Sequence, residues 1–181
     1  MTAKKSADSR SHYGLNAVAA ATIGYVGYSL VMLRLDNRMR RAGGPGIIPF
    51  ELAGTATKAE DIMDRWGADG QRAARLSMWL DFGYMTSYGI LLGLLVDRQR
   101  RRRGHPPWLP ALAAGAIAGD AVEGVALLRV LDRRDVAVNA RRAQVAASIK
   151  FAILAVALGY SFYPASASIQ KICQEWPSRS L

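Results

Sequence analysis

Four long apolar runs dominate this sequence and restrict the folds that it can adopt. They cover residues 13–33, 76–96, 108–131 and 143–163, and charged residues gather between them. A helix needs about 20 apolar residues, at ~1.5 Å per residue, to cross ~30 Å of hydrocarbon. Each run has that length. The sequence therefore predicts an all-α polytopic membrane protein whose transmembrane domain, residues 13–163, is a four-transmembrane-helix bundle.

Two other interpretations of the apolar runs fit less well. A soluble bundle of buried helices needs polar faces wide enough for water, and the third and fourth runs have none. A cleaved signal peptide would explain the basic residues before the first run. However, that run is longer than a usual signal core and ends in "VMLRLDN", without a small-residue cleavage site. We therefore expect the first run to be retained as a span.

The net charge of +10 arises from 24 Lys and Arg residues that flank the apolar runs. Membrane topology and anionic headgroups account for this placement, so membrane lipids are expected partners and nucleic acid is not. Four spans put the basic tail at 1–12, the "DRQRRRR" segment at 97–103 and the tail at 164–181 on one side. The short Arg run predicts that this side is cytoplasmic. We expect a multi-pass protein of the bacterial cytoplasmic (inner) membrane with a cytoplasmic N-terminus.

The long first loop predicts a short helix at about residues 58–66. Thr57 and Glu60 fit a capping box at its start, and Gly67 fits its end. The helix has an apolar side, formed by Ile62, Met63 and Trp66. That side predicts packing against the bundle; an interfacial helix in the headgroup layer, or a lid, is the alternative. A second short helix is expected around "SIQKICQEW" near the C-terminus.

Charged side chains interrupt three of the apolar runs. Counting ~1.5 Å per residue from the span ends places Asp81, Glu123 and Lys150 at similar depth, in the leaflet next to the first and third loops. Asp120 lies one turn deeper and shares a helix face with Glu123. A charge at the bilayer centre costs at least ~2.5–3.5 kcal/mol, so such residues face the bundle interior and pair with one another.

This cluster has a structural and a functional interpretation. In the structural one, Lys150 pairs with Glu123, tyrosine hydroxyls satisfy the other groups, and the network fixes helix register. In the functional one, three carboxylates against one ammonium leave two acids that are protonated, hydrated or bound to a partner, unless Arg75 or Arg129 reaches in. We predict a pocket for a lipid-like or amphipathic ligand, such as an amine or a sterol-like molecule. Its predicted contacts are Asp81, Tyr84, Tyr88, Asp120, Glu123 and Lys150, with Tyr25 or Tyr28 as further walls.

A different class of function also fits the sequence. The charges could dock a partner, which would make the protein an accessory or assembly subunit of a larger membrane complex. The GxxxG steps at 89–93 and 115–119 predict close helix packing and would also suit a homo-oligomer or a membrane protein partner. Charges confined to one leaflet argue against a complete proton relay. If the cluster catalyses a reaction, Asp120 or Glu123 is the expected acid–base group.

The sequence lacks the motifs that are typical of several kinds of catalytic and metal sites. There is no HExxH, P-loop, GxSxG or paired CxxC; Cys173 is the one cysteine, and His12 and His105 lie outside the apolar runs. We therefore expect no metal site and no cofactor, and neither phosphoryl transfer nor thiol redox chemistry.

Four segments together carry a resemblance: "FELAGTATKAEDIMDRW", "LDFGYMTSYG", "GDAVEG" and "IKFAI". Their combination resembles small, uncharacterised bacterial four-span membrane proteins, from the long loop to the fourth span. This resemblance implies a family and no particular activity. Acidic residues in a compact membrane bundle are also similar to the sterol-isomerase and sigma-2-receptor-like group. That likeness is one of architecture alone and implies no site residue.

Overall fold

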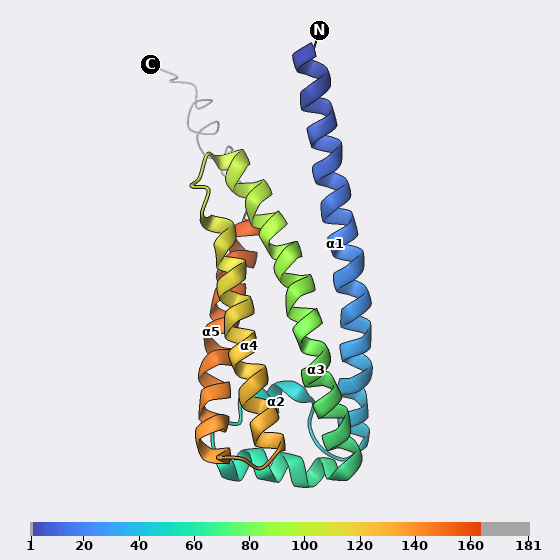
Figure 1. Ribbon diagram of the computed structural model, residues 1–181, viewed down its shortest axis with the longest axis vertical. Helices are drawn as coiled ribbons and strands as arrows, with labels where there is room; N and C mark the ends of the chain where they lie inside the picture. The colour runs from blue at the N-terminus through green and yellow to red at the C-terminus, as the bar shows by residue number, and fades with distance from the viewer. Residues whose placement is uncertain (1, 164–181) are drawn as a thin grey trace, which may run out of the picture.

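The structure, a computed structural model, describes the backbone of residues 2–163 and the side chains of residues 16–163. All its regular elements are helices (Figure 1), which confirms the predicted all-α class. They are α1 Thr2–Arg41, α2 Ile47–Glu51, α3 Ala56–Arg103, the 3₁₀ turn η1 Leu109–Ala111, α4 Leu112–Leu131 and α5 Val136–Phe162. The short helix expected around "SIQKICQEW" lies outside the described residues.

Four helical segments are long and apolar enough to cross a membrane, and the chain is a multi-pass membrane protein. They are Asn16–Arg41, Ala56–Arg103, Leu109–Leu131 and Val136–Phe162. The helices extend beyond most of the predicted apolar runs because charged residues continue them past the hydrocarbon. α3, for example, runs to Arg103 and stops at Gly104, whose φ of 70° is left-handed.

Small residues let the long helices pack closely against one another. α4 lies along both α3 and α5, whereas α1 packs mainly along α3. A Cβ added at Gly89 of α3 would lie 2.3 Å from Ile117 of α4, and one at Gly119 of α4 would lie 3.6 Å from the carbonyl oxygen of Ala146 on α5. Both predicted GxxxG steps therefore lie at contacts between helices of the same chain, where glycine allows close approach.

The first part of α3, residues 56–66, lies across one end of the bundle (Figure 1). Its N-cap is Thr55, whose hydroxyl accepts a hydrogen bond from the Lys58 amide at 3.3 Å. The expectation that Thr57 caps the helix is wrong because Thr57 is already inside it, whereas Thr55 has the extended backbone that a cap needs. Gly67, with φ 57° and ψ −166°, ends this part, and α3 then turns to run along the bundle.

The apolar side of residues 56–66 is buried against the bundle. Ile62, Met63 and Trp66 are fully or almost fully buried, which confirms that this helix packs on the bundle. The Trp66 indole also donates a hydrogen bond to the Pro45 carbonyl at 2.6 Å. The main hydrophobic core lies at this end, and its further members include Met39, Phe50, Met78, Leu127 and Val130. One turn before Leu127 on α4, the buried side chains become charged, at Glu123 and Asp120.

Candidate functional site

Lys150 of α5 lies at the centre of a buried cluster of acids. Its Nζ is 2.7 Å from Glu123 Oε2, 2.8 Å from Asp120 Oδ1 and 3.7 Å from Glu51 Oε2. The exposed fractions of Lys150, Asp120 and Glu123 are 6%, 3% and 2%. The predicted pairing of Lys150 with Glu123 is confirmed, and Asp120 joins it. One ammonium therefore contacts three carboxyl groups in a part of the bundle that is shielded from water.

The positions of these side chains follow from the α4–α5 contact. Asp120 and Glu123 are three residues apart on α4, so both face α5. Gly119 lets α5 approach, and a Cβ added there would lie 3.6 Å from the Lys150 Cβ. The lysine stem thus packs against the glycine, and its ammonium reaches the two carboxyl groups on the same helix.

Glu51 belongs to the cluster although the sequence did not predict it. It ends α2, in the first loop, and is 8% exposed. Phe50 beside it packs on Trp66 with 4.9 Å between ring centroids, which anchors α2 next to the bundle. Burial raises the pKa of the Glu51 carboxyl, although Lys150 opposes this effect. Counting depth along the spans cannot place a residue that lies in a loop. The sequence signal for Glu51 was that it is the one charged residue in the apolar segment "GIIPFELAG".

Asp81 of α3 is the least engaged acid. It is half-buried and lies beside Asp120. Within the described part of the chain it forms no ion pair with Lys150. Asp81 therefore shares the cluster, as predicted from its depth, but is not neutralised by the central ammonium.

Tyrosines connect the cluster to α1. The Tyr88 hydroxyl donates a hydrogen bond to Asp120 Oδ2 at 2.7 Å. The Tyr88 ring meets Tyr84 edge-on at 5.7 Å, and Tyr84 in turn stacks on Tyr25 of α1 at the same centroid distance. Tyr28 contacts α3 at Gly83, where an added Cβ would lie 2.2 Å from its hydroxyl. Of the predicted wall residues, Tyr88 contacts an acid directly, and Tyr84 and Tyr25 extend the row.

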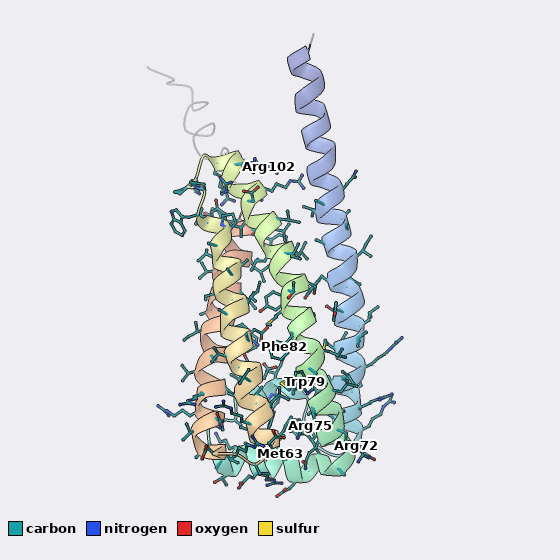
Figure 2. All side chains as sticks on the ribbon, in the orientation of Figure 1. Met63, Arg72, Arg75, Trp79, Phe82 and Arg102 are labelled. Carbon is teal, nitrogen blue, oxygen red and sulfur yellow. The ribbon has the colours of Figure 1, made fainter. Side chains whose placement is uncertain are left out.

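Arginines near the membrane surface do not neutralise the surplus acids. Arg75 could have reached the cluster, but its guanidinium pairs with Asp132 at 2.8 Å. Figure 2 shows Arg75 at the end of the bundle where Met63 and Arg72 also lie. Arg129 is exposed and makes no ion pair in the described chain with any acid of the cluster.

The cluster consequently contains four carboxyl groups around one ammonium. The four acids are Glu51, Asp81, Asp120 and Glu123. In a low-dielectric interior an uncompensated carboxylate is costly, so the surplus groups must hold protons, water, a cation or a hydrogen-bond donor. Among residues 16–163 no group of three or more histidine, cysteine or acidic side chains is arranged to hold a metal ion, and the Lys150 ammonium occupies the centre of the acids.

Comparison of the chain with protein families, curated proteins and solved structures finds no match. The resemblance to small bacterial four-span proteins therefore stays a prediction. The function of the cluster is inferred below from its geometry.

Proposed function

We propose that this membrane protein binds an amphipathic small ligand whose polar group carries an amine or a hydroxyl donor. The observation that supports this proposal is the surplus of carboxyl groups around Lys150. An amine or hydroxyl would satisfy an acid that the lysine does not reach. A ligand dissolved in the bilayer would reach this depth without crossing water.

Asp81 is the acid that this ligand would contact first. Both oxygens of Asp120 are engaged, one by Lys150 and one by Tyr88. Asp81 lies beside Asp120, lacks a described ion pair with Lys150 and is half-buried, so it combines the lack of a cation with access. The neighbouring aromatic faces of Tyr84 and Tyr25 would contact the apolar body of the ligand.

We propose the bacterial cytoplasmic membrane as the location, with the N-terminus on the cytoplasmic side. The Arg run in the last turns of α3 supports this orientation, because a short basic segment beside two spans is typical of the cytoplasmic face. Any reaction at the cluster would use Asp120 or Glu123 as its acid–base group, since these two contact the central ammonium.

Asp81→Asn tests the ligand site with little disturbance of the fold. The protein would be purified from its native membrane in mild detergent, and small molecules bound to it identified by native mass spectrometry. We expect Asp81→Asn to lower the bound fraction at least about tenfold, the loss of one charge-assisted hydrogen bond. Asp69→Asn changes an exposed acid of α3 near its bend, is the matched control, and should bind as the wild type does.

Two further variants decide the case if Asp81→Asn has no effect. Asp120→Asn and Glu123→Gln change the acids that contact Lys150. If bound molecules are the same in all three variants, while circular dichroism shows an intact fold, the ligand proposal is wrong.

A second candidate function is that of a subunit in a larger membrane complex, and the exposure of α1 favours it. Only 6% of the apolar window in α1 is buried within the chain, compared with 28–39% for the other spans. Ile23, Leu30 and Leu33 are among its exposed side chains. A stoichiometric co-purifying protein that cross-links to α1 would support this candidate. A monomer with no co-purifying protein would exclude it.

A further inference from the structure

A long groove runs along the outer face of α4 and α5, away from the acidic cluster. Its volume is about 720 Å³, and a smaller groove of about 360 Å³ adjoins it, sharing Val122 and Arg142. None of the residues that line either groove belongs to the cluster. The larger groove exists because α4 presents small residues to this face, namely Gly115, Ala118 and Gly119.

The groove is long enough for part of one acyl chain. From Arg142 to Ile149 along α5, seven steps of ~1.5 Å give about 10 Å. This is about two-thirds of one half of the ~30 Å hydrocarbon layer. Its floor and sides are apolar, with Val145 and Ile149 opposite the small residues of α4. The part of an acyl chain next to its headgroup would lie in this apolar section.

Three arginines lie at the end of the grooves nearest the loop that joins α4 to α5. Arg141 and Arg142 line the larger groove, and Arg129 and Arg142 line the smaller one. All three are exposed, and none forms an ion pair or hydrogen bond with an acid in residues 16–163. Neighbouring arginines differ in this respect, because Arg75 pairs with Asp132 and Arg133 with Asp64.

We propose that this groove binds an anionic phospholipid, with its phosphate on the arginines and one acyl chain along α4 and α5. Guanidinium groups match phosphate oxygens in charge and geometry. No acidic side chain lines either groove, so an amine or choline headgroup would find no counter-charge there. This site goes beyond the ligand proposed at Asp81, because Gly119 and Ala146 separate the groove from Lys150.

Lipid titration followed by native mass spectrometry tests this site. Purified protein in detergent would be titrated with phosphatidylglycerol and with phosphatidylcholine of the same acyl chains, and separately with glycerol phosphate. We expect phosphatidylglycerol to bind more tightly than phosphatidylcholine, and glycerol phosphate not to displace it. The double variant Arg141→Gln/Arg142→Gln should weaken phosphatidylglycerol binding about 30-fold, since each arginine near the surface contributes about a factor of five.

Matched variants separate a specific site from general charge attraction. Arg98→Gln/Arg102→Gln removes two exposed arginines at the opposite end of the molecule, where Figure 2 places Arg102, and should leave binding unchanged. Ala118→Leu fills the groove and should weaken binding of both lipids. Equal loss from both arginine pairs, or unchanged binding in Arg141→Gln/Arg142→Gln, would overturn the proposal. Asp81→Asn should not alter phosphatidylglycerol binding, so failure at one site is distinguishable from failure at the other.

Discussion

Lys150 is the residue on which the acidic cluster depends, since its ammonium contacts three of the four carboxyl groups. A buried ion pair adds little net stability compared with apolar residues of the same shape, but breaking one is expensive. The loss of the lysine would leave Asp120 and Glu123 buried without a cation. Variants at Lys150 therefore report directly on the charge balance.

Lys150→Met should lower the free energy of unfolding by about 3–5 kcal/mol. The methionine keeps much of the side-chain volume but leaves the acids unpaired. Unfolding in detergent, followed by circular dichroism against added denaturing surfactant, measures the change. Adding Asp120→Asn and Glu123→Gln to Lys150→Met should restore most of the lost free energy of unfolding. Wild-type stability in Lys150→Met alone would show that the ammonium is not paired inside the bundle.

Glu51 makes stability depend on pH. Burial raises its pKa above the ordinary value of 4.5, so the folded state binds its proton more tightly than the unfolded state does. This contribution is complete below the unfolded pKa and is lost as the pH rises through the folded pKa. Glu51→Gln removes the ionisation, so its thermal midpoint should rise relative to wild type between pH 5 and pH 9.

Glu60→Gln, in the helix at 56–66, is the control for Glu51→Gln. Its thermal midpoint would be measured over the same pH range. A constant difference between Glu51→Gln and wild type would mean that burial does not raise the pKa of Glu51 in the folded protein.

At the scale of elements, the helices were predictable because their apolar runs match the membrane thickness. Their ends were less predictable, since Arg and Asp residues continue a helix beyond the hydrocarbon, as in α3. Depth counting brought Asp81, Asp120, Glu123 and Lys150 together correctly because they all lie on spans. It missed Glu51, whose position depends on how α2 packs through Phe50 and Trp66, and local sequence does not encode that packing.

The bend of α3 at Gly67 provides a test of one element. Its φ of 57° and ψ of −166° are accessible almost only to glycine, yet a Cβ there would meet no atom within 4 Å. Gly67→Ala should therefore lower the free energy of unfolding by about 1–3 kcal/mol through backbone strain alone. Gly27→Ala on α1, which also meets nothing within 4 Å but lies inside a helix, should be neutral or slightly stabilising. Equal changes in the free energy of unfolding for Gly67→Ala and Gly27→Ala would contradict the glycine-specific backbone conformation at the bend.

At the scale of the whole molecule, the three connections between the long helices are divided between the two ends of the bundle. The turn after α3 lies at one end of the bundle, and α2, residues 56–66 and the α4–α5 connection lie at the other (Figure 1). The proposed orientation puts the α3 turn in the cytoplasm.

Cysteine labelling tests the orientation in intact cells. In a Cys173→Ser background, Arg134→Cys should react with a membrane-impermeant maleimide added outside, and Arg102→Cys should react only after the membrane is opened. The reverse pattern would invert the orientation. Labelling of both from one side would contradict the single span, Leu109–Leu131, that lies between them.

The most direct test of a ligand site at the acidic cluster is an experimental density map of the protein purified with its native lipids. We expect Lys150 in contact with Asp120, Glu123 and Glu51, and non-protein density with a polar end beside Asp81. A cluster that is closed around Lys150 with no density at Asp81, and a neighbouring subunit packed on α1, would contradict the ligand site and favour the subunit function.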